Sequence, residues 1–310
     1  MSLLDIVNLN ISFATRAGVV QASDEVSFKI RKGEALCLIG ESGCGKSIVA
    51  LGIMRLLPGN ARISGKIFFN GRDLLSLHKK AMRKMRGRDI AMIFEQPAGC
   101  LNPVLSVGNQ IAEAVKIHEN CSGKISRQRA VDLMALVGIP CPCKRYSQYP
   151  YEFSGGMAQR VMIAMALASH PSLLIADEPT TSLDVTIQAQ IIELLKNLVS
   201  QFNTSLLLIT HDLGVAAQMC DSVVVMYAGG IIEKGRMSDV FKNPGHPYTQ
   251  ALLKAASGKE PASVKGSVPE LTRLPDGCRF HPRCELSQDI CRKIMPQMKK
   301  GVKCHIQKKT

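Results

Sequence analysis

The chain has no tryptophan, and aromatic residues make up only 5% of its 310 residues. Because proteins that bind single-stranded nucleic acid stack the bases on aromatic side chains, this composition argues against a base-stacking surface. No apolar run approaches the roughly 18 residues that a membrane-spanning helix needs. The N-terminal stretch MSLLDIVNLN contains Asp5 and has no basic lead-in, so it does not resemble a secretory signal peptide. We therefore expect a chain that stays in the cytoplasm and does not cross a membrane.

Acidic residues are also few: 25 Asp and Glu face 39 Lys and Arg, which gives a net charge of +14. Such an excess suits phosphate ligands, nucleic acid or an anionic membrane surface, and it does not choose among them. The hydrophobic content of 46% is enough to bury a large core, which excludes a disordered or fibrous chain. In a reducing compartment the 11 cysteines favour thiols or metal ligation over a disulfide framework.

Apolar periodicity predicts strands and helices in alternation. The expected strands are residues 3–13, 21–30, 34–39, 62–70, 90–94, 173–176, 206–209 and 223–226. The expected helices are residues 46–57, 77–86, 107–118 and 125–137. This alternation is typical of a parallel α/β sheet, with antiparallel strands at the N-terminus and a helical insertion at about residues 95–158. We expect one main domain over residues 1–235 and a small Cys-rich extension over residues 236–310 that is no more than an appendage.

The string GESGCGKS matches the phosphate-binding pattern G-x-x-x-x-G-K-[ST] and lies between an expected strand and an expected helix. Its residues are Gly40, Glu41, Ser42, Gly43, Cys44, Gly45, Lys46 and Ser47. The glycines let backbone N–H groups surround phosphate oxygens, Lys46 would reach the β and γ phosphates, and the Ser47 hydroxyl would bind Mg²⁺. The alternative is a glycine turn with an incidental lysine. The strand–loop–helix context favours a P-loop NTPase with a RecA-like core.

A second signal is the apolar run LLIA followed by Asp177, Glu178 and Pro179. Paired carboxylates at a strand end suit Mg²⁺ binding by the first and activation of water by the second. Taken alone, the pair would be read as a solvated strand end. Downstream of a phosphate loop, the functional interpretation is the stronger one.

With these motifs the chain resembles the ATPase subunits of ABC transporters, and the resemblance runs nearly end to end. The family's signature loop appears here as Ser154, Gly155, Gly156 and Met157, followed by Gln159. Three further matches are the Ser182-Leu183-Asp184 loop, the histidine His211 and the aromatic Phe13, which the family stacks on adenine. For His211 the alternative is a structural histidine at a strand end, and for Phe13 a core residue. The resemblance implies that two such chains sandwich ATP, so that the signature loop of one acts on the phosphate loop of the other.

One position departs from the family pattern. The family has Gln directly after the Phe that ends the strand, whereas here Phe94 is followed by Glu95 and then Gln96. Glu95 could bind Mg²⁺, but a carboxylate cannot donate a hydrogen bond and would repel the triphosphate. Either Glu95 serves this site, or Gln96 reaches it through a shifted loop. The resemblance implies a coupling role for this position and for Asp184. For Glu95 that role is open.

Within the family, the strings NPGHPYTQALL, ADEPTTSLDVTIQAQII and GCRFHPRC most resemble oligopeptide and dipeptide importer ATPases. The resemblance implies ATP-driven peptide import at the cytoplasmic face of the membrane. It also implies as partners a second, non-identical ATPase subunit, two permease subunits and an extracytoplasmic substrate-binding protein. Importers of nickel or other small solutes share much of this pattern and remain the alternative. A soluble ABC ATPase acting on nucleic acid is a further alternative, but such proteins carry coiled-coil insertions or duplicated units, which this sequence lacks.

The tail cysteines Cys278, Cys284, Cys291 and Cys304 have the spacing C-x5-C-x6-C-x12-C. This lacks the short C-x2-C pairs that structural zinc favours, although four thiolates suit either zinc or an iron–sulfur centre. The importer resemblance implies a [4Fe–4S] cluster that organises the tail; zinc and free thiols are the alternatives. Two basic runs, at residues 79–88 and 292–309, are either solvated faces or contacts to acidic lipid head groups.

Overall fold

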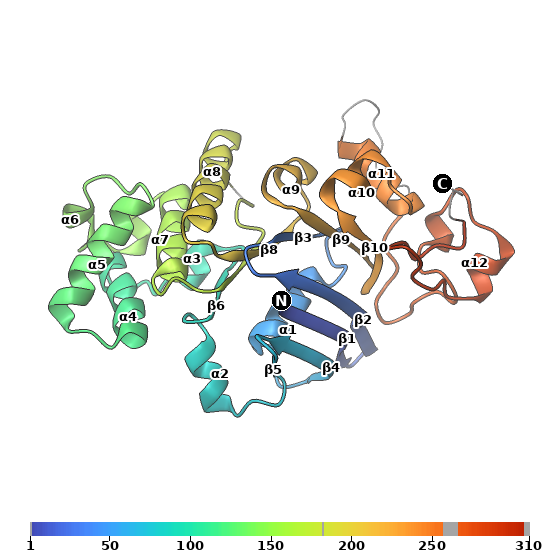
Figure 1. The fold of residues 1–310 in the computed structure, drawn as a ribbon, viewed down its shortest axis with the longest axis horizontal. Coiled ribbons are helices and arrows are strands. Elements are labelled where there is room, and N and C mark those ends of the chain that lie inside the picture. Colours follow the sequence, from blue (N-terminus) through green and yellow to red (C-terminus); the bar gives the residue numbers. More distant parts are fainter. Residues whose placement is uncertain (1, 182, 257–265, 307–310) are drawn as a thin grey trace. The chain divides into compact units, whose positions relative to one another are not determined.

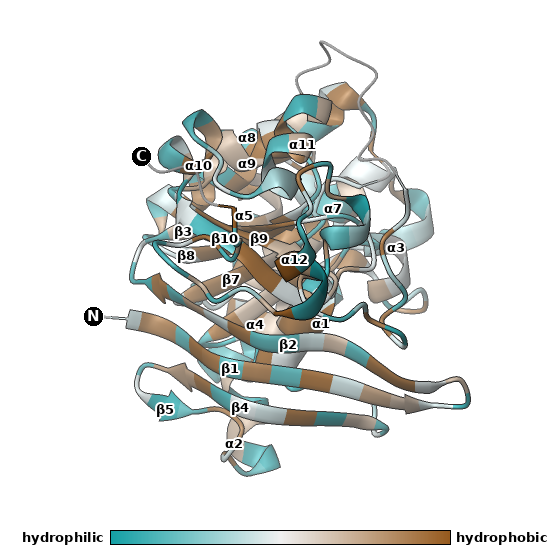
Figure 2. Ribbon diagram, turned by 90° about the vertical axis from the view of Figure 1, so that its right-hand side faces the viewer, coloured by the Kyte–Doolittle hydropathy of each residue, from teal (hydrophilic) through white to brown (hydrophobic). Residues whose placement is uncertain are grey.

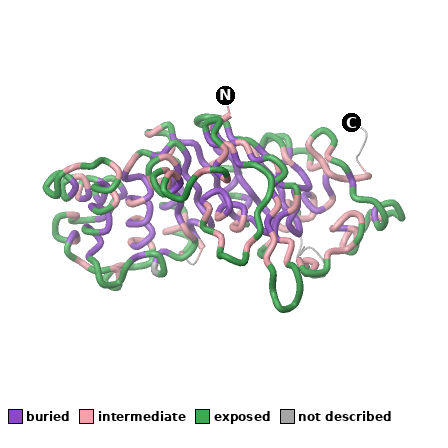
Figure 3. Tube along the Cα trace, turned by 90° about the horizontal axis from the view of Figure 1, so that it is seen from below, coloured by how far each residue is buried: buried purple, intermediate pink, exposed green. Residues whose placement is uncertain are grey.

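The computed structural model describes residues 2–181, 183–256 and 266–306. The chain divides into two compact units, shown in Figure 1: the residues up to Ser76 together with those from Leu208 onward, and the residues Leu77–Leu207 between them. In each unit, buried residues form the interior, while exposed residues lie in the outer loops (Figure 3). None of the helices within the described ranges has the length and apolar character needed to span a membrane.

An antiparallel sheet lies at the start of the first unit. It contains β1 (Ser2–Thr15), β2 (Gly18–Arg31), β4 (Ala61–Phe69) and β5 (Arg72–Asp73), in the order β2-β1-β4-β5. Apolar and polar residues alternate along these strands (Figure 2), and β1 buries Leu4, Ile6, Leu9 and Ile11. A period of two holds within each pair, Leu4 with Ile6 and Leu9 with Ile11, and a register shift between Ile6 and Leu9 separates the two pairs. The predicted antiparallel N-terminal subdomain is confirmed.

The first unit also contains the strands that carry the phosphate-loop motif. These are β3 (Ala35–Ile39), β8 (Ser205–Thr210), β9 (Ser222–Tyr227) and β10 (Gly230–Arg236), in the order β10-β9-β3-β8. β3 pairs with β9 in parallel and is buried at every position, which explains its unbroken apolar sequence. β10 is antiparallel to β9 and was not predicted. The helices beside these strands are α1 (Lys46–Met54) and α9 (Leu213–Met219).

The second unit contains the parallel pair β6 (Ile90–Ile93) and β7 (Leu173–Asp177). Its helices are α2 (Lys79–Met85), α3 (Pro97–Cys100), α4 (Val107–Glu119), α5 (Gly123–Leu136), α6 (Pro142–Arg145), α7 (Gly155–Leu167) and α8 (Val185–Gln201), with a 3₁₀ turn η1 (Pro150–Glu152). α4 packs on both α5 and α7. The predicted parallel sheet with a helical insertion is therefore present.

The chain after β10 folds onto the first unit. It contains α10 (Met237–Lys242), α11 (Pro247–Ala256), the 3₁₀ turn η2 (His281–Arg283) and α12 (Asp289–Lys293), none of which was predicted as an element. Phe280 is only 3% exposed, and its ring lies 5.2 Å from that of Tyr227 on β9 and 5.4 Å from that of Tyr248 on α11. The expectation of a mere appendage was wrong, because this aromatic cluster gives the tail a buried contact with the sheet.

Candidate functional site

The phosphate-loop motif forms the turn between β3 and α1. Gly40, Gly43 and Gly45 have φ values of 156°, 78° and 100°, a region that residues with a side chain rarely adopt. A Cβ at Gly40 would collide with the carbonyl oxygen of Met226, and one at Gly45 with that of Ala22. The loop is thus packed tightly against the backbone of β9 and β2, and α1 starts at Lys46 with its first N–H groups directed at the loop. This is the arrangement that binds phosphate groups.

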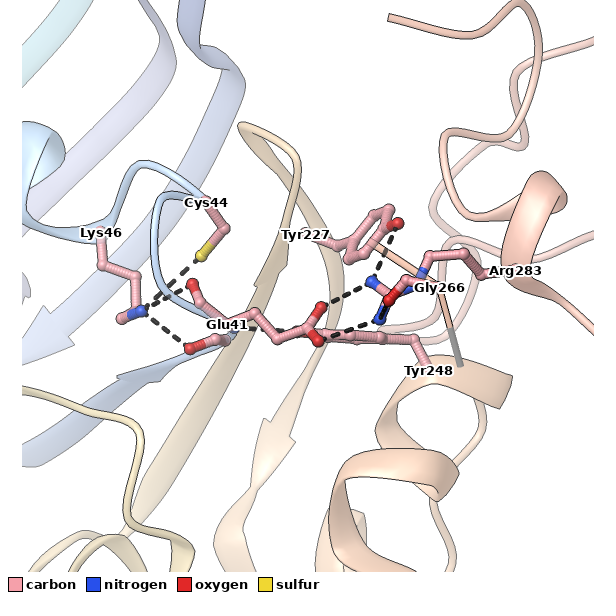
Figure 4. Close-up of polar contacts among 8 residues, drawn as sticks. Glu41, Cys44, Lys46, Tyr227, Tyr248, Gly266 and Arg283 are labelled. Atoms are coloured by element: carbon pink, nitrogen blue, oxygen red, sulfur yellow. Dashed lines mark hydrogen bonds and ion pairs between the residues drawn. The ribbon is translucent and has the colours of Figure 1, made fainter. Parts of the chain in front are cut away.

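The Lys46 side chain is held inside this loop. It is 6% exposed, and its Nζ donates to the carbonyl oxygens of Gly40 at 2.8 Å and Glu41 at 3.0 Å (Figure 4). Burial raises the pKa of the Cys44 thiol, which lies 3.8 Å from the Lys46 ammonium. Cys44 is therefore a neutral packing residue of the loop, and Lys46 is the charge that the loop offers to a ligand.

Glu41 connects the loop to the C-terminal part of the chain. Its backbone N–H donates to the Tyr248 hydroxyl at 2.9 Å, and its carboxylate accepts hydrogen bonds from Arg283 at 2.7 Å and 3.0 Å (Figure 4). The hydrogen bonds to Glu41 raise the pKa of the Arg283 guanidinium, and burial raises that of the Tyr248 hydroxyl. Neither Tyr248 nor Arg283 was predicted as a residue of the site. They occur in the strings NPGHPYTQALL and GCRFHPRC, which indicate only the subfamily.

The acidic pair lies at the end of β7 in the second unit. Asp177 is the last residue of the strand and is 6% exposed. Glu178 follows with a φ of 46°, a left-handed conformation that is strained for a residue with a side chain. Its carboxylate accepts a hydrogen bond from the Thr181 hydroxyl at 3.1 Å. The turn after the strand thus fixes the orientation of the Glu178 side chain.

The signature loop begins α7. Ser154 is the N-cap residue, and its Oγ accepts a hydrogen bond from the Met157 N–H at 3.4 Å. Ser154 and Gly155 are exposed, and a Cβ at Gly156 would collide with Ile187. Gln159 is only 1% exposed, and its Nε2 has no hydrogen-bond partner among the described residues. The exposed part of the predicted loop is therefore its start, whereas Gln159 faces the interior.

The remaining predicted residues of the second unit lie in two turns. Glu95 and Gln96 are both exposed between β6 and α3, where Gln96 occupies the N-cap position without a side-chain cap. Asp184 is the N-cap of α8, with Oδ1 accepting from the Ile187 N–H at 3.0 Å. This gives Asp184 a structural role that its position before a helical run would have predicted. Ser182 lies outside the described residues.

Two other predicted residues, His211 and Phe13, also lie in the first unit. His211 is exposed and directly follows β8. The next residue, Asp212, caps α9 by accepting from the N–H groups of Gly214 at 2.7 Å and Val215 at 3.1 Å. Phe13 is half-buried on β1, opposite Val20 of β2.

The four tail cysteines approach one another but do not form a ready metal site. Burial and then the charges of the other three thiols raise the pKa of Cys278 to about 11, and Cys284 and Cys304 are affected in the same direction. All 11 cysteines are free thiols. Within the described ranges, no group of three or more His, Cys, Asp or Glu side chains is arranged to hold a metal ion. The proximity fits the expected convergence, but the arrangement gives no support for a bound cluster.

Comparison with known proteins gives two family matches. Residues 23–181 match the family described as ABC transporter, and residues 232–291 match the family described as oligopeptide/dipeptide transporter, C-terminal region. The dipeptide transport ATP-binding protein DppD of Haemophilus influenzae is 47% identical and covers 98% of this chain and 96% of its own. The oligopeptide transport ATP-binding protein OppD of Bacillus subtilis is 49% identical, and the match covers 98% of this chain and 87% of OppD.

Solved structures agree with these matches. A dimeric, post-hydrolysis structure of the ATP-binding cassette MJ0796 bound to ADP and Pi has a TM-score of 0.68 at 25% identity, over 76% of this chain and 98% of that one. The structure of cbiO1 from Clostridium perfringens has a TM-score of 0.65 at 24% identity, over 83% and 96%, which supports the fold alone. The chain belongs to the ATP-binding subunits of the ABC transporter family, in its oligopeptide and dipeptide transporter group.

Proposed function

We propose that this chain hydrolyses ATP to power the import of oligopeptides or dipeptides through a membrane ABC transporter. One observation carries the proposal: a phosphate loop built around Lys46 and a C-terminal region of the oligopeptide/dipeptide type occur in the same chain. Relatives over nearly the full length carry names of dipeptide or oligopeptide transport. An ATPase of this kind works with a membrane permease, since it does not itself contact the transported molecule.

ATP is the substrate that the phosphate loop suits. The backbone N–H groups of the loop and of the start of α1 would bind phosphate oxygens, and the Lys46 ammonium would neutralise the β and γ phosphates. Only glycine fits at Gly40 and Gly45, because the loop lies directly against the backbone carbonyls of Met226 and Ala22. The Ser47 hydroxyl and the Asp177 carboxylate are the hard oxygen ligands that Mg²⁺ prefers, and Mg²⁺ would screen the charge of the phosphates.

Glu178 is the residue that we assign to water activation. A carboxylate placed beside the γ-phosphate accepts a hydrogen bond from the attacking water and orients it. The hydrogen bond from Thr181 limits how far the Glu178 side chain can rotate. We assign to His211, exposed at the end of β8, a contact to the γ-phosphate.

A second ATPase chain would complete the site. Ser154 and Gly155 are exposed at the start of α7, where a hydroxyl and helix N–H groups can approach the phosphates of another chain. We propose that this second chain is non-identical and that the pair binds two permease subunits on the cytoplasmic face of the membrane. An extracytoplasmic protein would deliver the peptide. The isolated chain is then expected to be a poor ATPase.

From the importer resemblance we also propose one [4Fe–4S] cluster, with one thiolate each from Cys278, Cys284, Cys291 and Cys304. What supports it is the closeness of the four thiols to one another and their free state. The described side chains are not arranged to hold a metal as they stand. No step of ATP hydrolysis requires the cluster, and its expected role is to organise the tail.

Uptake into sealed vesicles tests the transport function. The chain is reconstituted with its permease and partner ATPase, and ATP is enclosed on the side of the ATPase subunits. With the extracytoplasmic substrate-binding protein supplied on the opposite side, we expect ATP-dependent accumulation of a labelled dipeptide. Accumulation of Ni²⁺ in place of the peptide, or ATP hydrolysis that responds to DNA and not to peptide, would contradict the proposal.

A further inference from the structure

Arg283 of the C-terminal region forms a two-point ion pair with Glu41 of the phosphate loop. The guanidinium is 5% exposed and the carboxylate 27%, so both groups are largely shielded from water. The guanidinium also lies over the rings of Tyr227, at 5.7 Å, and Phe280, at 6.0 Å, and donates a hydrogen bond to the Tyr227 hydroxyl oxygen at 3.3 Å. A planar guanidinium held by two rings and a carboxylate has little rotational freedom. The position of Glu41 is therefore fixed from outside the loop.

The fixed position of Glu41 also orients the Lys46 side chain. Its carbonyl oxygen accepts a hydrogen bond from the Lys46 ammonium at 3.0 Å, while its N–H donates to Tyr248 at 2.9 Å (Figure 4). All three polar groups of one loop residue are thus engaged, two of them by residues beyond β10. A displacement of Glu41 would move the carbonyl that orients the Lys46 ammonium.

The other side of the loop is held by Arg279 in a similar way. Arg279 pairs with Asp24 and donates to the Ala228 carbonyl at 2.6 Å, in the turn between β9 and β10. The next residue of that turn, Gly229, donates its N–H to the Cys44 carbonyl at 3.0 Å. The short segment from Cys278 to Cys284 therefore contacts the phosphate loop directly at Glu41, through Arg283, and is linked to Cys44 only through the Ala228-Gly229 turn.

The contact with Arg283 compensates the negative charge of the Glu41 carboxylate. A carboxylate in a loop that must bind a triphosphate repels its ligand, and the repulsion is strong where water is excluded. Arg283 neutralises the carboxylate and directs it away from Lys46, toward the C-terminal region (Figure 4). Without that partner, the carboxylate would be free to turn toward the phosphates or toward the Lys46 ammonium.

We propose that Arg283 is a positioning residue of the ATP site, which holds Glu41, and through its carbonyl the Lys46 ammonium, in the arrangement that binds the phosphates. The segment from Cys278 to Cys284 is accordingly part of the nucleotide site and not a separate module. The inference rests on the proposed ATP-hydrolysing function. It differs from the expectation that the extension is no more than an appendage.

Titration of the full-length chain with Mg-ATP tests the inference. We expect Arg283→Ala to raise the dissociation constant about tenfold, because the loop loses its external constraint and gains an uncompensated negative charge. Arg283→Lys keeps the charge but not the two-point geometry, so its dissociation constant should lie between those of the wild type and of Arg283→Ala. The matched control is Arg292→Ala, which removes the same charge from an exposed position of α12 and should change the constant less than about twofold.

A double-mutant cycle separates positioning from general damage to the tail. Glu41→Gln removes the partner charge, so Arg283→Ala added to it should weaken binding less than about twofold further. In the reconstituted transporter, Arg283→Ala should raise the KM for ATP more than it lowers kcat. Thermal unfolding of each variant shows whether it is folded, and the Arg283→Lys and Glu41→Gln variants carry the test should Arg283→Ala not fold.

Three results would overturn the inference: unchanged ATP affinity in folded Arg283→Ala, an equal loss in Arg292→Ala, or full additivity with Glu41→Gln. In each case the wild-type chain still binds ATP, so the proposed function stands. Failure of the wild-type chain to bind ATP at all would instead contradict the proposed function.

Discussion

Arg283 donates two hydrogen bonds to the carboxylate of Glu41, at 2.7 Å and 3.0 Å, although 242 residues separate them in the sequence. The contact joins the C-terminal region to the loop that carries Lys46. The pair lies beside the rings of Tyr227 and Phe280, through which the chain after β10 packs on β9. The nucleotide site of this chain thus includes residues that its phosphate-loop motif does not contain.

Replacement of Lys46 by alanine should weaken ATP binding itself. The Lys46 ammonium is the charge that the loop presents, and a hydrogen bond from a charged group contributes about 1.5–3 kcal/mol, which is roughly a 10- to 100-fold change in affinity. Equilibrium titration with Mg-ATP measures this loss. Lys196→Ala, on an exposed face of α8, is the control for the removed charge. An affinity equal to that of the wild type would remove Lys46 from the site.

The fold could be predicted from the sequence because its signals are local. The apolar run of β3 predicts a strand, and the glycines that follow it predict the phosphate loop. The alternation of apolar and polar residues in β1 predicts a strand of the antiparallel sheet. β10 was not predicted. It is antiparallel to β9 across a tight turn in which Ala228 has a φ of 45°, and an alanine in the sequence does not indicate this conformation.

Residues of the candidate site could be predicted only where they belong to a sequence motif. The pairing of Glu41 with Arg283 has no local pattern, since nothing in a sequence states which distant charges meet. The burial of Gln159 follows from the packing of α7, and the capping of α8 by Asp184 competes with any role in coupling. Such outcomes depend on tertiary contacts.

The order of Glu95 and Gln96 gives a test of which residue serves the magnesium side of the site. We expect Glu95→Gln to preserve or raise hydrolysis by the reconstituted transporter, because it removes repulsion with the triphosphate. A fall in hydrolysis in Gln96→Ala with no change in Glu95→Gln would assign the role to Gln96. If alanine at either position is harmless, neither residue serves the site.

The metal content of the tail is directly measurable. Protein purified without oxygen should be brown and contain about four iron atoms per chain, as a four-thiolate cluster requires. Cys284→Ser should bleach it, whereas Cys141→Ser, at an exposed position of a loop, should leave the iron in place. A colourless protein with one tightly held zinc would support the zinc alternative, and one without metal would leave free thiols.

The metal-free thiols should differ in reactivity. Burial, followed by the neighbouring thiols, raises the pKa of Cys278 to about 11, so at pH 7 almost none of it is the reactive thiolate. Alkylation of Cys278 by iodoacetamide should therefore be much slower than that of the exposed Cys141, and should accelerate as the pH rises toward 11. Mass spectrometry of peptides from timed samples reports both rates. Equal rates at pH 7 would contradict the raised pKa of Cys278.

The most direct test of the account is ATP hydrolysis by the reconstituted transporter, compared between the wild type and Glu178→Gln. The amide cannot accept the proton of the attacking water, so turnover should fall by roughly 10²- to 10⁴-fold while Mg-ATP still binds with wild-type affinity. Peptide uptake measured in the same vesicles should be lost together with hydrolysis. A Glu178→Gln transporter that hydrolyses ATP at the wild-type rate, or that imports peptide without hydrolysis, would contradict the account.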